Sequence, residues 1–162
     1  MKKTLRICFV CAGNICRSPT AEAIMRRLVA ERGLEGRILI ESAGTGSWHV
    51  GDRADARARE AGLARGYALD RRAQQFKRAF FDRFDYVLAA DQNNQSHLLR
   101  IAPDQRAAAR VHLLRAFDAD SPEGAEVPDP YYGGPEGFEE VLDVCEAACR
   151  GLLDQLAREL EA

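Results

Sequence analysis

One short segment near the start of the chain limits the possible fold and function more than any other. It reads Cys-Ala-Gly-Asn-Ile-Cys-Arg-Ser-Pro over residues 11–19. An apolar run, Leu5–Val10, precedes it, and a stretch with helical spacing of apolar residues follows it. The pattern predicts a buried strand, a tight loop and the start of a helix. In such a unit the loop amides and the free N–H groups of the helix's first turn converge, which is the geometry of an anion site.

Individual residues of this segment suit an anion-binding loop. Gly13 can take backbone angles that a side chain would forbid, and Asn14 tolerates left-handed geometry. Ser18 can cap the helix, and Pro19 suits its first position. Arg17 can donate two hydrogen bonds to a tetrahedral oxyanion. We therefore expect the anion to lie against Arg17.

Cys11 would lie where this anion binds. Positive potential from the amides, the helix end and Arg17 favours a thiolate over a thiol. Cys11 is therefore a candidate nucleophile toward phosphorus, with Arg17 stabilising the equatorial oxygens. The alternative for an isolated cysteine is a small, buried and inert side chain at a strand end.

The full string resembles the signature of the low-molecular-weight protein tyrosine phosphatases, V-C-x-G-N-x-C-R-S-P-x-A-E. Residues 10–22 match every defined position. The resemblance implies a hydrolase of phosphotyrosine in which Cys11 and Arg17 are catalytic and a phosphocysteine intermediate forms. It also implies that phosphate binds to the loop made of Ala12, Gly13, Asn14, Ile15, Cys16, Arg17 and Ser18.

Length and composition describe a chain of ordinary domain size. Of its 162 residues, 46% are hydrophobic and 30% are charged, so we expect one domain over residues 1–162. The net charge of −2 predicts no nucleic-acid or membrane partner. No apolar run approaches the ~18 residues of a membrane helix, and the start does not resemble a signal peptide. The five cysteines, an odd number, favour thiol chemistry in a reducing, cytoplasmic compartment.

Strand and helix patterns alternate along the chain. The predicted strands are residues 5–10, 37–41, 86–90 and 111–114. The predicted helices are residues 18–32, 52–63, 77–84, 92–101 and 135–161, with Asp52 as a possible cap of the second.

This alternation predicts an α/β fold, a flavodoxin-like three-layer sandwich in which helices cover both faces of a four-stranded parallel sheet. Ligands of such sheets bind beyond the carboxyl ends of the strands. The expected site is therefore lined by the loops 11–18, 42–51, 90–92 and 115–132.

Asp129 is the candidate general acid for the leaving oxygen. It lies between Pro128 and Pro130, which fixes the direction of its carboxylate, although such a sequence alone is usually only a turn. Low-molecular-weight tyrosine phosphatases carry their acid in a D-P-Y/F motif before the last helix. The resemblance therefore implies that Asp129 protonates the phenolate and later activates water.

The resemblance also implies an aromatic substrate pocket. Tyr131 and Tyr132 would form one wall and Trp48 the opposite wall. The alternative for Trp48 is a core position, but its glycine-rich loop favours exposure. Ile15 is typical of the tyrosine phosphatases, whereas relatives that act on phosphoarginine have Thr there, so Ile15 favours phosphotyrosine.

Further polar residues are implied to support the loop. In the family, Asn14, Ser18 and Ser42 hold it by side-chain hydrogen bonds. Asp91 either matches a family residue near the active-site loops or only caps the helix that follows it. The chain departs from the family at Arg71, which stands where a His is often found, and the effect of this change stays open.

Cys16 is the second cysteine of the signature. The resemblance implies reversible oxidation, in which Cys16 captures oxidised Cys11 as a disulfide. The alternative is that Cys16 only packs under the loop.

No metal or other cofactor is expected, because the histidines are scattered and no nucleotide-binding G-x-x-x-x-G-K-[ST] pattern occurs. The expected partners are a phosphotyrosine-containing protein and inorganic phosphate, as product and inhibitor. An arsenate reductase of the same fold would need two further cysteines after the third strand, and residues 85–103 contain none. A phosphopeptide-binding module without activity would lack the nucleophile or the acid, and both are present.

Overall fold

The computed structural model describes residues 3–162 and is built on a parallel sheet of four strands in the order β2-β1-β3-β4. The strands are β1 (Leu5–Cys11), β2 (Ile38–Gly44), β3 (Tyr86–Ala89) and β4 (Val111–Leu113). The helices are α1 (Arg17–Glu31), α2 (Ala56–Ala64), α3 (Gln92–Ile101), α4 (Gln105–Ala108) and α5 (Pro135–Glu161). Two 3-10 turns, η1 (Arg78–Asp82) and η2 (Leu114–Phe117), complete the fold.

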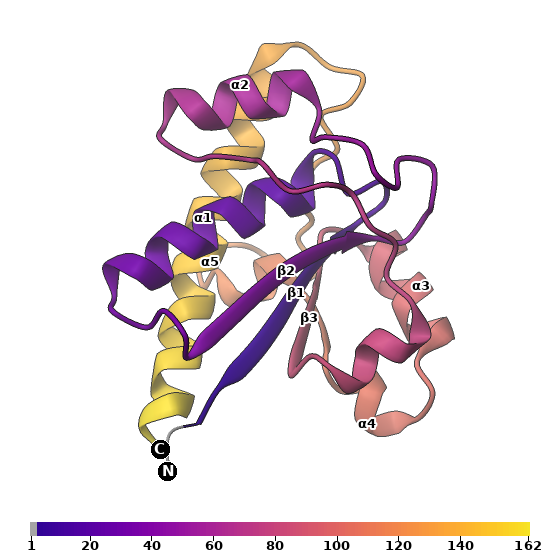
Figure 1. Ribbon diagram of the computed structural model, residues 1–162, viewed down its shortest axis with the longest axis vertical. Helices are drawn as coiled ribbons and strands as arrows, with labels where there is room; N and C mark the ends of the chain where they lie inside the picture. Colours follow the sequence, from indigo (N-terminus) through magenta and orange to yellow (C-terminus); the bar gives the residue numbers. More distant parts are fainter. Residues whose placement is uncertain (1–2) are drawn as a thin grey trace.

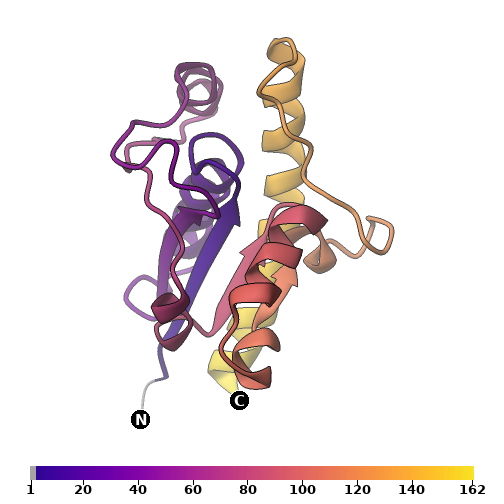
Figure 2. The same cartoon turned by 90° about the vertical axis from the view of Figure 1, so that its right-hand side faces the viewer.

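Helices cover both faces of the sheet, as the alternating pattern predicts. Helices α1 and α5 pack together on one face, and α3 and α4 cover the other (Figure 1). In Figure 2 the side that carries α3 and α4 faces the viewer. Helix α2 lies beyond the carboxyl ends of β1 and β2, against α5. The arrangement confirms the predicted three-layer α/β class.

The central strand β1 is apolar on both sides because both sides are buried. Ile7 and Phe9 point into the large core beneath α1 and α5, whereas Cys8 and Val10 point into a smaller core on the opposite face. A parallel strand between two helical layers requires this continuous apolar run. The smaller core also holds a phenylalanine cluster, in which the Phe76 and Phe81 rings meet edge to face at 5.0 Å.

Most predicted boundaries agree to within one residue, and three elements differ more: α2, β2 and the helix predicted over residues 77–84, which is the shorter 3-10 turn η1. Helix α2 begins at Ala56, not at residue 52, because Asp55 and not Asp52 is its N-cap and accepts a hydrogen bond from the Arg57 N–H. Strand β2 continues to Gly44, since Ser42 and Ala43 stay paired with β1. Among residues 3–162, no helix is long and apolar enough to cross a membrane.

Candidate active site

The loop over residues 11–18, called the 11–18 loop below, lies at the carboxyl end of β1. Cys11 is the last residue of the strand and Arg17 is the first of α1. The end of β2 supports the loop from the side, since the Thr45 N–H donates to the Cys11 carbonyl oxygen at 2.8 Å. The approach is close: a Cβ on Gly44 would lie 2.7 Å from the Ala12 carbonyl oxygen. Glycine at position 44 is therefore a condition for this loop geometry.

Three expectations about the loop backbone meet different outcomes. Asn14 adopts the predicted left-handed conformation, with φ of 58°. Gly13 does not; its lack of a side chain instead makes room for His49, whose Cδ2 would lie 2.9 Å from a Cβ at position 13. Ser18 does not cap α1, because the helix begins one residue earlier with Cys16 at the N-cap position. The Ser18 hydroxyl instead forms a hydrogen bond with Cys11 Sγ.

Cys11 is buried, and its sulfur contacts two groups of Ser18. The Ser18 Oγ lies 3.0 Å from Cys11 Sγ, and the Ser18 backbone N–H donates to the same sulfur at 3.4 Å. Both groups can donate to a thiolate. Cys16 has a different environment, because burial, followed by the charge of Asp55, raises its pKa to about 12. Cys16 is therefore a protonated thiol near neutral pH.

Arg17 is 5% exposed and reaches the same pocket. Its Nη1 donates to Asp91 Oδ2 at 2.7 Å and to the Val127 carbonyl oxygen at 3.1 Å. Burial opposes its charge, but Cys11 and Asp91 raise the pKa of Arg17 further above its ordinary value. Asp91 also accepts from the Asn94 N–H at 2.7 Å, so it both caps α3 and orients Arg17. The two roles considered for Asp91 thus occur together.

A cavity of about 300 Å³ opens above the 11–18 loop and brings the predicted pocket residues together. Trp48 is 73% exposed and Tyr132 is 94% exposed, so neither belongs to the core. Asp129 lies at the same opening, with its Oδ2 3.9 Å from Arg17 Nη2. The lining consists of Cys11, Ala12, Gly13, Ile15, Cys16, Arg17, Trp48, His49, Asp129, Tyr131 and Tyr132.

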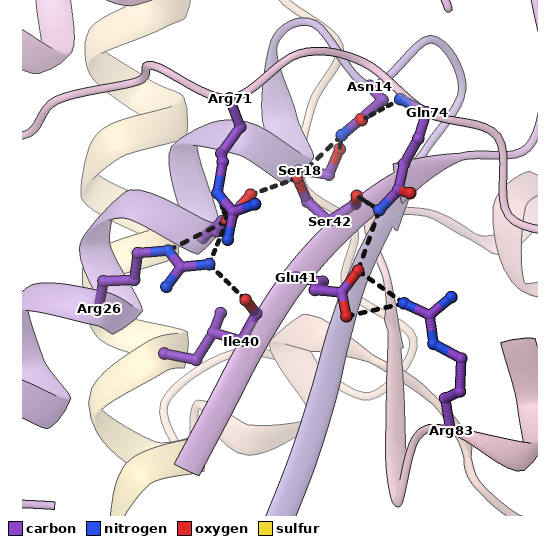
Figure 3. Close-up of polar contacts among 10 residues, drawn as sticks. Asn14, Ser18, Arg26, Ile40, Glu41, Ser42, Arg71, Gln74 and Arg83 are labelled. Carbon is purple, nitrogen blue, oxygen red and sulfur yellow. Dashed lines mark hydrogen bonds and ion pairs between the residues drawn. The ribbon is translucent and has the colours of Figure 1, made fainter. Parts of the chain in front are cut away.

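Asn14 is the centre of the hydrogen bonds that support the loop (Figure 3). Its Nδ2 donates to Ser18 Oγ at 2.7 Å and to Ser42 Oγ at 3.0 Å. Its Oδ1 accepts from the Gln74 N–H at 3.0 Å. The predicted support residues Asn14, Ser18 and Ser42 therefore form one network, which Gln74 joins.

Glu22 determines which groups donate and which accept the hydrogen bonds of this network. Ser42 donates its only hydroxyl proton to Glu22 Oε1 at 2.5 Å, so the Ser42 oxygen must accept from Asn14. The second amide hydrogen of Asn14 points to Ser18, so the Ser18 hydroxyl proton can be donated to Cys11 Sγ at 3.0 Å or to the Ala43 carbonyl oxygen at the longer distance of 3.4 Å. The buried carboxylate of Glu22 thus favours donation toward the Cys11 sulfur.

Two arginines balance the charge of Glu22. Arg26 Nη2 lies 2.6 Å from Glu22 Oε2, and Arg71 Nε lies 3.3 Å from the same oxygen. Arg71 thus reaches the network only through Glu22, and half of its side chain is exposed. The four-residue spacing of Glu22 and Arg26 on a predicted helix would have indicated their ion pair from the sequence.

No comparable sequence pattern indicates that His49 lies at the cavity.

Cys145 and Cys149 do not belong to the lining of this cavity. Both are fully buried in α5, and burial raises the pKa of Cys145 to about 12. Within residues 3–162, no three His, Cys, Asp or Glu side chains are grouped so that they could hold a metal ion.

Comparison with known proteins gives consistent matches over nearly the whole chain. The family model for low molecular weight phosphotyrosine protein phosphatase matches residues 6–162. A low molecular weight protein-tyrosine-phosphatase of Streptomyces coelicolor is 48% identical, over 98% of this chain and 97% of that protein. The low molecular weight protein-tyrosine phosphatase A of Mycobacterium tuberculosis is 44% identical, over 95% of this chain and 93% of that protein. A crystal structure of a protein tyrosine phosphatase from Entamoeba histolytica superposes with a TM-score of 0.92 at 39% identity, covering 96% of this chain and 99% of that one.

Proposed function

The chain belongs to the low molecular weight phosphotyrosine protein phosphatase family, and from this premise we propose that it hydrolyses phosphotyrosine in proteins with Cys11 as nucleophile and Asp129 as general acid. The observation that carries the proposal is the meeting of Cys11, Arg17 and Asp129 in one cavity at the end of β1. A nucleophile, a cation for the phosphoryl oxygens and a proton donor are the groups that phosphoryl transfer needs.

In the first step the Cys11 thiolate attacks phosphorus in line with the tyrosyl oxygen. The S–P bond forms while the P–O bond to tyrosine breaks, and Asp129 gives its proton to the leaving phenolate. The amides of the 11–18 loop and Arg17 bind the equatorial oxygens, where charge is spread in the transition state. The hydrogen bond from the Tyr131 N–H to Asp129 Oδ1, 3.1 Å long, orients the acid.

In the second step water hydrolyses the phosphocysteine. Asp129, now a carboxylate, takes a proton from the water as its oxygen attacks phosphorus. The S–P bond breaks and its electron pair returns to Cys11, where the Ser18 hydroxyl and N–H can stabilise the thiolate. Inorganic phosphate is the product and, bound to the same loop, an inhibitor.

The shape of the cavity supports an aryl phosphate as substrate. The Tyr131 and Tyr132 rings meet edge to face at 5.0 Å, and Trp48 lines the cavity with them. Ile15 lines the same space and favours a phosphotyrosine ring over the phosphoarginine chain of the alternative substrate. We further propose that residues 1–162 act as a single domain in the cytoplasm.

Hydrolysis of p-nitrophenyl phosphate in the presence of EDTA tests the proposed function. Turnover is expected because the mechanism uses only groups of this chain and water, and no step needs a metal ion. Phosphotyrosine and phosphoarginine are compared next, and higher kcat/KM for phosphoarginine would reverse the substrate assignment. Reduction of arsenate with thioredoxin, in place of ester hydrolysis, would support the reductase alternative.

Trp48→Ala is expected to raise KM for aryl phosphopeptides with a smaller change in kcat. An exposed pocket wall binds the ground state and the transition state alike, so its loss weakens binding more than chemistry. Steady-state kinetics with a phosphotyrosine peptide measure both constants. An unchanged KM together with a lower melting temperature would assign Trp48 to packing.

Peroxide is expected to inactivate the enzyme reversibly through Cys11 and Cys16. Peroxide oxidises the Cys11 thiolate to a sulfenic acid, and the Cys16 thiol displaces water from it to form a disulfide. The high pKa of Cys16, about 12, keeps this residue protonated and directs peroxide to Cys11 first. Dithiothreitol should restore activity, and bound phosphate should slow the loss.

Cys16→Ser tests this protection. Recovery after peroxide, measured relative to the variant's own starting activity, is expected to fall sharply, because sulfenic acid without a partner oxidises irreversibly. Full recovery in the variant, or a Cys8–Cys11 disulfide found by mass spectrometry, would remove Cys16 from the protective role.

A further inference from the structure

Arg57, in the first turn of α2, contacts the loop that carries Asp129 and the helix that follows this loop. The loop is residues 129–134, called the 129–134 loop below. The Arg57 guanidinium lies between two rings, with its Cζ 5.3 Å from the centre of the Tyr131 ring and 4.9 Å from that of Phe138. Tyr131 belongs to the 129–134 loop and Phe138 to the start of α5. Such stacking suits a planar guanidinium.

Hydrogen bonds lead from Arg57 to Asp129 in two steps. Arg57 Nη1 donates to the Tyr131 carbonyl oxygen at 3.0 Å. The Tyr131 N–H donates to Asp129 Oδ1 at 3.1 Å. Tyr131 is therefore held at both of its backbone polar groups, and a movement of this residue would move the Asp129 carboxylate.

The opposite edge of the Arg57 guanidinium connects to the 11–18 loop. Its Nε and Nη2 donate to the two oxygens of Asp55 at 3.1 and 2.9 Å. The Asp55 N–H in turn donates to the Ile15 carbonyl oxygen at 2.8 Å. Hydrogen bonds from Arg57 hold the pKa of Asp55 below its ordinary value, so this pair stays charged near neutral pH. Arg57 therefore bridges the loop of the nucleophile and the loop of the acid.

Open space lies beside this bridge. A cavity of about 350 Å³ separates α2 from the end of the 129–134 loop, and Arg57, Gly133, Gly134 and Pro135 are part of its lining. The end of the loop therefore borders this cavity instead of packed side chains. Two consecutive glycines add conformational freedom there. The position of the loop therefore depends strongly on the contacts at Tyr131.

We propose that Arg57 is a positioning residue for the general acid, which it holds in place through Tyr131. The inference rests on the role proposed for Asp129, and Arg57 itself does not touch the reacting atoms. Its loss should therefore affect substrates whose leaving oxygen needs a proton far more than others, because the pocket wall that Tyr131 forms serves every aryl substrate alike. Lysine should replace it only in part, because a lysine has no planar fork to bind Asp55 while its face stacks on two rings.

The test compares kcat/KM for phosphotyrosine with kcat/KM for 2,4-dinitrophenyl phosphate, whose leaving group needs no proton. Arg57→Met keeps an apolar chain between the rings and removes the hydrogen bonds. It is expected to lower the phosphotyrosine value roughly 10- to 100-fold, since a misplacement of about 1 Å can cost 10²-fold. The dinitrophenyl value should fall far less, by no more than a weaker pocket wall at Tyr131 would cause, and Arg57→Lys should lie between Arg57→Met and the wild type. Equal losses on the two substrates would overturn the proposal.

The double variant Arg57→Met/Asp129→Ala separates this inference from the proposed function. If Arg57 acts only through the acid, the double variant is no slower than Asp129→Ala alone. Losses that multiply would contradict the inference. If Asp129→Ala itself shows no dependence on the leaving group, the assignment of the acid fails instead.

Two further measurements exclude a general structural effect. Arg59→Gln is the matched control on the same helix, because Arg59 Nε donates to the Ala54 carbonyl oxygen and Arg59 forms no hydrogen bond or ion pair with the 129–134 loop. This variant should leave kcat/KM unchanged for both substrates. The rate of Cys11 alkylation by iodoacetate should be the same in Arg57→Met as in the wild type. A changed rate would mean that Arg57 supports the 11–18 loop, which would overturn the inference.

Discussion

Cys11→Ser is expected to abolish turnover while the fold stays intact. The serine hydroxyl remains protonated at working pH, so no nucleophile is left to attack phosphorus. The contacts of position 11 with Ser18 suit an oxygen as well as a sulfur, so the loop should keep its shape. Loss of the attacking group should cost several kcal/mol of barrier, and activity above ~1% of wild type would contradict the assignment.

Two controls accompany this variant. Cys8→Ser makes the same change in the same strand, but the Cys8 side chain points into the core on the opposite face of the sheet. It should retain turnover per folded molecule even where stability falls. Binding of inorganic phosphate to Cys11→Ser, measured by calorimetry, should persist, because the amides of the 11–18 loop and Arg17 remain. Loss of this binding would indicate a collapsed loop and would leave the nucleophile unidentified.

The parts of the fold that could be predicted are those in which burial dictates the residue pattern. Strand β1 follows from its continuous apolar run and helices α3 and α5 from their apolar periodicity, and α3 and α5 have the predicted bounds. The end of β2 could not be predicted, because Ser42–Gly44 has the composition of a loop. It is a strand since β1 supplies its hydrogen bonds, with Cys11 opposite Gly44. Helix α4 is a single turn that Asp104 caps, too short for a periodic signal.

The residues of the candidate site also fall into those that the sequence indicates and those that only tertiary packing brings together. Cys11, Arg17, Asn14 and Ser18 lie within one short segment, where sequence spacing nearly determines spatial distance. Arg57 and Tyr131 are 74 residues apart, and their contact exists only because α2 lies against α5. A resemblance to a family supplies Asp129, but no local pattern indicates which residue holds it. Positioning residues of this kind follow from tertiary packing.

Asp129→Ala is expected to slow the hydrolysis of phosphotyrosine ~10²- to 10⁴-fold, the usual contribution of a general acid. The loss should be far smaller for 2,4-dinitrophenyl phosphate, because its phenolate leaves without a proton.

Asp129→Ala should not unfold the chain. The Asp129 side chain is 57% exposed and its Oδ2 lies 3.9 Å from Arg17 Nη2, so its removal leaves no buried charge unpaired.

Two possible roles of Asp129, proton donor or residue that orients Arg17, predict different leaving-group dependences for this variant. A plot of log kcat/KM against the pKa of the leaving phenol measures the effect directly. If Asp129 donates the proton, the slope becomes steeper in the variant, since negative charge then accumulates on the leaving oxygen. If Asp129 only orients Arg17, every ester slows by the same factor and the slope does not change. A parallel shift of the line would therefore move the acid role to another residue.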